Sequence, residues 1–179
     1  MDIQTFLSQW AGKWFSQRSH YDFSQQVADN QKSELTVETF LSPSAELSSL
    51  VQTTPWAADQ VLGALKLGWD TSVDWGKPKQ TGGQVYLFLT APTLNHGPLW
   101  RSPARPGEPA CQGSYTLNHD ESLVLVLTQG DFQIEERHWF ASPNLRFRTS
   151  LILQNQQYSH SAFYSEIRKL PPAQPAEQS

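Results

Sequence analysis

The chain has 179 residues, of which 17% are charged, and a formal net charge of −4. This length fits one domain rather than two, and so small a negative charge leaves no broad cationic surface for a nucleic acid. The single cysteine, Cys111, excludes an intramolecular disulfide, and no apolar stretch approaches the roughly eighteen residues that a membrane span needs. We therefore expect a cytoplasmic protein that binds neither nucleic acid nor membrane.

The predicted elements begin with a short helix over residues 4–10, where Phe6, Leu7 and Trp10 recur at helical spacing before Gly12. Residues 33–41 alternate apolar and polar side chains, as a half-buried strand does, and a short helix with a loop is expected over 43–60. From Val61 onward, strand-like runs recur roughly every eight to twelve residues between turn residues.

This spacing predicts an all-β fold, an antiparallel up-and-down barrel of about ten strands with an N-terminal helix and one short helical insertion. We expect one domain over residues 1–169. The proline-rich tail over residues 170–179 has nothing to bury and is expected to be disordered.

Aromatic residues are abundant, with seven Trp, nine Phe and five Tyr. Alternation along residues 65–75 predicts that Trp69 and Trp75 both face the interior. Two interpretations remain open for this pair. The indoles either pack the core or provide stacking surfaces for a conjugated ligand.

Charged residues within the later strands are the other candidates for a site. Alternation along residues 131–141 places Glu136 on the apolar face. A carboxyl group buried there should pair with a cation, donate a hydrogen bond as a neutral acid, or accept from a ligand's N–H groups. Arg146 and Arg148 share one face of a strand over 144–153 and could bind carboxylates. Because the opposite face is the more apolar one, that pair points either to solvent or to a wet barrel lumen.

The final strand gathers rings and charges on one face, which suits a site wall, a barrel surface or a dimer contact: Tyr158, His160, Tyr164, Glu166 and Arg168. The sequence has no motif for phosphate binding, for nucleophilic hydrolysis or for a metal, so no metal cofactor is expected. Cys111 has no identifiable base beside it, and an inert thiol is the favoured interpretation over a covalent acceptor.

Two stretches carry a family resemblance. The segment Gly12-Lys13-Trp14 resembles the G-x-W signature of lipocalins and fatty-acid-binding proteins, which are calycins. More specifically, residues 135–150, which read EERHWFASPNLRFRTS, resemble the S-type (CpcS/CpeS) phycobiliprotein lyases. Residues 12–18, 32–35 and 165–168 resemble the same family, and the similarity runs in order from about residue 1 to 168.

The resemblance implies a ten-stranded barrel that holds an open-chain tetrapyrrole, a bilin such as phycocyanobilin, without a covalent bond. It implies transfer of the bilin through a thioether to a cysteine of a phycobiliprotein α or β subunit, in the cyanobacterial cytosol or plastid stroma. The residues implied in bilin binding are Trp69, Trp75, Arg146, Arg148, Arg18 and Glu166. Glu136 is implied as the catalytic carboxylate, which would hydrogen-bond the pyrrole nitrogens. The chain departs from the family at residues 70–74 and 19–22.

Other functions fit the same residues. The first alternative is a non-catalytic carrier of a fatty acid, haem or retinoid. Another is a scaffolding protein whose aromatic face docks a second chain. As a lyase, the protein could act as a homodimer or as a heteromer with a related lyase.

Overall fold

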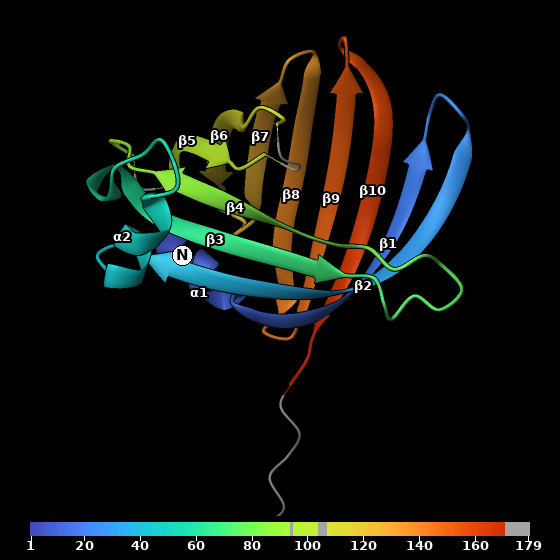
Figure 1. The fold of residues 1–179 in the computed structure, drawn as a ribbon, viewed down its shortest axis with the longest axis horizontal. Helices are drawn as coiled ribbons and strands as arrows, with labels where there is room; N and C mark the ends of the chain where they lie inside the picture. Colours follow the sequence, from blue (N-terminus) through green and yellow to red (C-terminus); the bar gives the residue numbers. More distant parts are fainter. Residues whose placement is uncertain (94, 104–106, 171–179) are drawn as a thin grey trace, which may run out of the picture.

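The computed structural model describes residues 1–93, 95–103 and 107–170. The described residues form a closed β-barrel with two α-helices and one 3₁₀ turn (Figure 1). The strands are β1 (Gly12–Asp22), β2 (Val27–Leu41), β3 (Val61–Asp70), β4 (Thr81–Leu89), β5 (His96–Arg101), β6 (Cys111–Leu117), β7 (Leu123–Gln129), β8 (Phe132–Ser142), β9 (Leu145–Gln154) and β10 (Gln157–Arg168).

Every strand pairs antiparallel with its neighbour in the sequence, and β1 pairs with β10 to close the sheet. Closure removes the free edges at which an open sheet would pair with other chains. The prediction of an all-β, up-and-down barrel with about ten strands is confirmed. The tail prediction falls largely on residues 171–179, which lie outside the described residues.

Helix α1 (Ile3–Trp10) covers one end of the barrel and confirms the predicted N-terminal helix. Asp2 caps it, because its carboxylate accepts a hydrogen bond from the Thr5 amide at 2.8 Å. The helix buries its apolar stripe among interior side chains: Ile3, Phe6, Leu7 and Trp10. This end of the barrel is therefore filled by side chains, and any cavity must lie in the other part.

Helix α2 (Ala45–Val51) and the turn η1 (Ala58–Gln60) confirm the predicted helical insertion within residues 43–60. Leu47 and Val51 pack on outward-facing residues of β3 and β4, in a second hydrophobic cluster outside the barrel. Helices α1 and α2 lie toward the same side of the molecule (Figure 1). None of the helices in the described part of the chain is long and apolar enough to cross a bilayer.

Strand β3 is shorter than predicted, and this corrects the expectation for Trp75. The strand ends at Asp70, whose carboxylate accepts a hydrogen bond from the Ser72 amide at 2.8 Å and starts a turn. Trp69 keeps its inward position, but Trp75 lies in the loop that follows and is 92% exposed. The prediction that both indoles face the interior is right for Trp69 and wrong for Trp75.

Strand β9 turns its polar face inward. Arg146 is 1% exposed and Ser150 7%, while Phe147 lies on the outer face and stacks on Phe163 of β10 with ring centroids 5.6 Å apart. From the sequence, the two arginines of this strand could point either to solvent or to a water-filled lumen. In the structure they point to the interior of the barrel.

The segment with the G-x-W pattern ties the barrel together at its closed end. The Trp14 ring lies between two guanidinium groups, that of Arg168 at 4.1 Å and that of Arg146 at 5.3 Å from the ring centroid. Arg168 also donates hydrogen bonds to the backbone carbonyls of Gln9 and Ala11 at the end of α1. These contacts join the first and last strands to the helix.

Candidate functional site

A cavity of about 230 Å³ opens inside the barrel, on the side that α1 leaves free. Its wall combines cations, one carboxylate and aromatic rings, contributed by β1, β3, β4, β5, β8, β9 and β10: Arg18, Trp69, Tyr86, Arg101, Glu136, Arg148 and Tyr164. Four of the residues expected in the site therefore line this cavity, namely Trp69, Arg18, Arg148 and Glu136.

Glu136 and Arg148 are the charged centre of the wall. Arg148 Nη1 lies 3.5 Å from Glu136 Oε1, and the Arg148 guanidinium also covers the Tyr164 ring at 3.6 Å. Burial by itself raises the pKa of Glu136, but Arg148, His138 and Arg101 together lower it to about 2. The carboxylate is therefore ionised and able to accept hydrogen bonds from a ligand.

Arg146 and Glu166 do not line the cavity. They form a buried ion pair in which Arg146 Nη2 donates to Glu166 Oε2, with exposed fractions of 1% and 0%. The Arg146 guanidinium lies 4.1 Å from the centroid of the Trp10 ring. The two arginines of β9 face the same interior, as predicted, but only Arg148 reaches the cavity wall.

A chain of contacts links this buried pair to the wall. Arg148 Nη2 lies 3.8 Å from Glu166 Oε1, so Arg148 stands between two carboxylates. We call Glu136, His138, Arg146, Arg148 and Glu166 the interior charge network. Burial by itself raises the pKa of Glu166, but Arg146 and Arg148 lower it overall. The interior charge network therefore contains both ionised carboxylates and arginine cations.

His138 is the neutral member of the interior charge network. Its Nε2 lies 3.2 Å from Glu136 Oε2, and its ring packs on Trp10 with centroids 4.5 Å apart. Burial lowers the pKa of His138, although Glu136 partly opposes this shift. A neutral ring with the proton on Nε2 donates to the carboxylate and fixes its orientation.

The Trp69 indole lies over the backbone of β4. A Cβ atom added at Gly82 would come within 2.1 Å of Trp69 Cζ2, so only glycine leaves room for the ring in this position. Gly82 and Trp69 are paired in the β3–β4 register. The ring is thereby placed at the cavity wall by a cross-strand contact.

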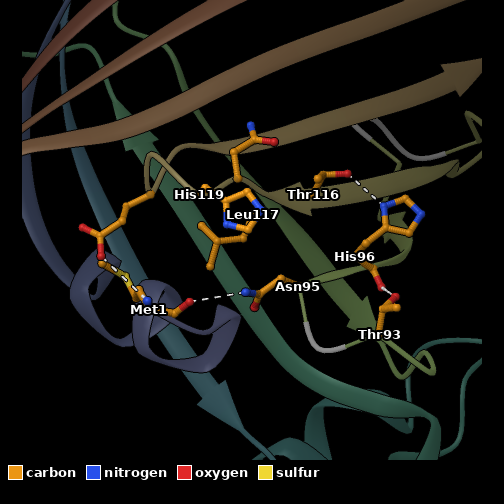
Figure 2. A pocket seen from close by; sticks show the side chains of 9 residues that line it. Met1, Thr93, Asn95, His96, Thr116, Leu117 and His119 are labelled. Carbon is orange, nitrogen blue, oxygen red and sulfur yellow. Dashed lines mark hydrogen bonds and ion pairs between the residues drawn. The ribbon is translucent and has the colours of Figure 1, made fainter.

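A second hollow, of about 430 Å³, is lined by Met1 and by residues from β5, from β6 and from the turn that follows β6 (Figure 2). Its described lining residues pair among themselves, as the Asn95 amide does with the Met1 carbonyl and His96 Nδ1 with Thr116 Oγ1 at 2.8 Å. Its only ion pair in the described residues joins the N-terminal amine to Glu121. None of its described lining residues is a tryptophan, tyrosine or phenylalanine that could stack on a planar ligand, so the smaller barrel cavity is the better candidate.

Arg101, Tyr86 and His138 were not selected from the sequence as site residues. A signal existed for Arg101, because Leu99 and Arg101 share the inward face of β5, and Leu99 is 1% exposed. Cys111 is 2% exposed and its Sγ accepts a hydrogen bond from Arg101 Nη2 at 2.9 Å, so the thiol has a cationic neighbour that the sequence did not reveal.

Comparisons with known proteins agree with this architecture. Residues 2–169 match a family model described as CpeS-like protein. A relative from Synechocystis sp. strain PCC 6803, named "Chromophore lyase CpcS/CpeS 1", is 48% identical over 177 residues, which cover 97% of this chain and 94% of the relative.

Two more distant proteins extend the comparison. A relative from Picosynechococcus sp. strain PCC 7002, named "Phycocyanobilin lyase subunit CpcS", is 26% identical and the alignment covers 93% of this chain and 86% of the relative. The solved structure of the S-type phycobiliprotein lyase CpeS from Guillardia theta matches with a TM-score of 0.77 at 21% identity, covering 96% and 94% of the two chains. That structural likeness supports the fold.

Proposed function

The chain belongs to the CpeS-like family, and on that premise we propose that it is a phycobiliprotein lyase. It binds a bilin without a covalent bond and attaches it through a thioether to a cysteine of a phycobiliprotein subunit. The observation that carries this function is the barrel cavity, where arginines, one carboxylate and an indole converge. A bilin offers a partner for each of them in its two propionates, its pyrrole N–H groups and its conjugated plane.

The proposed roles follow from the chemistry of each wall residue. Arg148 and Arg18 bind propionate, since charge-assisted hydrogen bonds contribute roughly 1.5–3 kcal/mol each when partly desolvated. Glu136 accepts hydrogen bonds from pyrrole N–H groups and favours the protonated bilin. Trp69 packs on a ring face.

The remaining predicted residues act outside the cavity. A volume of about 230 Å³ is below the ~300–1,000 Å³ of pockets that enclose a whole ligand, so a tetrapyrrole extends beyond the mouth. We assign Trp75, exposed on the loop after β3, to the protruding part. Arg146 and Glu166 are positioning residues, because they hold Arg148 from behind.

The reaction is an addition with no leaving group. The acceptor's sulfur bonds to the outer carbon of the ethylidene on bilin ring A, and the thiol proton ends on the ring carbon of the former double bond. The lyase contributes one bilin conformer and one exposed face, a proximity effect that also sets the stereochemistry. Glu136 acts by holding the ring nitrogens in their protonated form.

The substrates follow from the relatives and from this chemistry. We propose phycocyanobilin or a related bilin as the ligand, as in the relative named a phycocyanobilin lyase subunit, and α or β phycobiliprotein subunits as acceptors. A reducing compartment such as the cytosol keeps the acceptor cysteine as a free thiol. That relative is named a subunit, which points to an assembly of more than one chain. Light scattering of this chain alone and mixed with a related lyase distinguishes a homodimer from a heteromer.

The experiment that tests the function combines the purified chain, phycocyanobilin and a candidate apo-subunit. We expect a red-shifted absorbance on binding and a covalent adduct, retained after denaturation, that forms faster than without the chain. The proposal would be contradicted if the chain, tested alone and together with a related lyase, attached the bilin to no α or β subunit faster than the spontaneous reaction does. Competition by fatty acid, haem or retinoid without any attachment would instead support the carrier alternative.

A variant tests the site itself. Arg148→Gln is expected to weaken phycocyanobilin binding about tenfold or more, because it removes a charge-assisted contact. Arg137→Gln is the matched control on β8, since the Arg137 side chain is 51% exposed and contacts Asp120 and the Trp139 ring rather than the cavity. Equal affinities of the two folded variants would show that Arg148 does not bind the ligand.

A further inference from the structure

Arg101 occupies the last position of β5, in a row of inward-facing side chains across three strands. Tyr86 of β4 and Cys111 of β6 are its register partners on either side. Arg101 is 7% exposed and lines the barrel cavity. Its guanidinium is therefore largely removed from bulk water and in contact with the space that a ligand would fill.

Arg101 has no carboxylate within 4 Å among the described residues, although Glu136 interacts with it at longer range. The other inward-facing arginines each have a carboxylate within 4 Å: Arg146 has Glu166, Arg148 has Glu136 and Glu166, and Arg18 has Asp29 at 3.8 Å. For Arg101 the structure gives instead the neutral acceptor Cys111 Sγ at 2.9 Å from Nη2, and its Nε has no partner in the described part of the chain.

A buried cation without a carboxylate in direct contact is costly, and its cost falls when an anion binds. Cys111 and Tyr86 hold the guanidinium on the two sides of β5, and Arg101 lines the cavity, where it can also donate to a ligand.

The cavity wall as a whole carries three arginines and one carboxylate. Asp29 and Glu166 compensate Arg18 and Arg148 from outside the wall. Arg101 is therefore the wall cation whose charge a ligand with acid groups would balance.

The topology separates Arg101 from Arg148. They lie on β5 and β9, with β6, β7 and β8 between them in the ten-stranded ring. Glu136 on β8 interacts electrostatically with both. A bilin carries its two propionates on the two inner rings, one on each side of the central methine bridge, so it offers two separate acid groups to two separate cations.

We propose that Arg101 binds one acid group of a dicarboxylate ligand, in the role that the sequence had given to Arg146. Arg148 binds the other acid group, together with Arg18, which lies in the same register row through Tyr164. The inference rests on the proposed function and makes it more specific. Arg101 is a ligand-binding residue, and Cys111 is the residue that positions it.

The test measures the dissociation constants of phycocyanobilin and of its dimethyl ester by absorbance titration, for the full chain and for Arg101→Gln. In the unsubstituted protein the free diacid is expected to bind at least tenfold more tightly than the ester. Arg101→Gln should lose about tenfold in affinity for the diacid and little for the ester, while Arg101→Lys should recover part of the loss. Arg137→Gln, on the outer face, is the control and keeps the preference for the diacid.

If a folded Arg101→Gln binds the diacid and the ester each as tightly as the unsubstituted protein does, the inference is overturned and the proposed function stays intact. A parallel loss for both ligands would also overturn it, because it would show a structural role. If the variant does not fold, the two monomethyl esters are titrated against the unsubstituted protein, where each blocked acid group must cost affinity. Failure of the unsubstituted protein to bind phycocyanobilin would contradict the proposed function itself.

Discussion

At the scale of single residues, Arg146 and Arg148 show how two arginines on one strand face can have different roles. Arg146 is enclosed by the Trp10 and Trp14 rings and by Glu166, whereas Arg148 has a 14% exposed side chain at the cavity wall. A fully enclosed ion pair contributes little net stability, but removal of one partner leaves the other charge buried and unpaired. The two positions therefore respond differently to the same substitution.

We predict that Arg146→Gln lowers the free energy of unfolding by about 3–5 kcal/mol, because Glu166 stays buried, loses the cation that donates a hydrogen bond to it and keeps only Arg148, at 3.8 Å, as a cationic partner. Urea denaturation followed by tryptophan fluorescence measures the change. Arg146→Gln combined with Glu166→Gln should recover part of the loss, since the double variant buries no charge at these positions. A loss below 1 kcal/mol in the single variant would show that the pair is hydrated or dispensable.

His138 makes the stability of the fold depend on pH in the mildly acidic range. Burial lowers the pKa of His138 from its ordinary 6.5 in the native state, while the unfolded chain protonates this residue near 6.5. Between these two values the unfolded state binds more protons, so stability falls as the pH decreases below about 6.5. Glu136, with its pKa lowered from 4.5 to about 2, adds a further loss below about pH 4.5.

We predict that His138→Gln makes stability fall less steeply below about pH 6.5. The slope should decrease by up to one proton, which corresponds to about 1.4 kcal/mol per pH unit. His20, whose pKa burial also lowers, is present in both proteins, so its contribution cancels. Urea denaturation at several pH values gives the slopes. Identical slopes would mean that His138 is protonated in the native state.

At the scale of elements, the pair of β3 and β4 places the Trp69 indole by leaving Gly82 without a side chain. A Cβ at Gly82 would overlap three atoms of the indole, at 2.1, 2.6 and 2.7 Å. At Gly68, on the neighbouring position of β3, a Cβ would meet only the Gly82 carbonyl oxygen, at 3.8 Å. The two glycines of one strand pair thus have different tolerance for a methyl group.

We predict that Gly82→Ala displaces the Trp69 ring and weakens phycocyanobilin binding about tenfold, whereas Gly68→Ala leaves binding within twofold. The readouts are the dissociation constant and the quenching of tryptophan fluorescence by bound bilin. Trp69→Phe in the Gly82→Ala background should recover part of the affinity, because a smaller ring fits beside the new methyl group. Normal binding by Gly82→Ala would show that the position of the indole does not matter.

The elements also show which parts of the site could be predicted. Alternation placed Glu136 and Trp69 correctly, because both lie within regular strands, and it overextended β3 to Trp75. The turn at Asp70 and Ser72 was readable in principle, since both are residues that hydrogen-bond their own backbone in turns. For β9 the period identified two faces but could not say which is interior, because this lumen is polar.

At the scale of the whole molecule, the closed barrel could be predicted from strand spacing and family resemblance, but the division of its interior could not. Which half α1 fills, and which half stays open beside Arg148, depends on packing between residues far apart in the chain. Arg101 belongs to the open half through contacts with Tyr86 and Cys111 that no local pattern specifies. The site is therefore a tertiary property, even though most of its residues sit in predictable strands.

The closed end depends on Arg168, which connects three separate parts of the chain. Its guanidinium donates to the carbonyls of Gln9 and Ala11 at 2.6 and 2.5 Å and to that of Pro143 at 3.1 Å, and it covers the Trp14 ring. The carbonyls at the end of α1 have no intrahelical partner, so a cation there satisfies them and favours the helix dipole. The barrel's last strand thus fastens its first helix.

We predict that Arg168→Gln lowers the free energy of unfolding by about 2–4 kcal/mol, because several hydrogen bonds from a charged donor are lost together. Lys13→Gln is the matched control, since Lys13 is exposed on β1 near the same end of the barrel. Hydrogen exchange adds spatial resolution, because the amides of α1 should exchange faster in Arg168→Gln while those of β6 and β7 follow only the global loss of stability. Uniform acceleration across the barrel would mean that α1 and the sheet unfold as one unit, and that Arg168 stabilises the whole barrel rather than the docking of its helix.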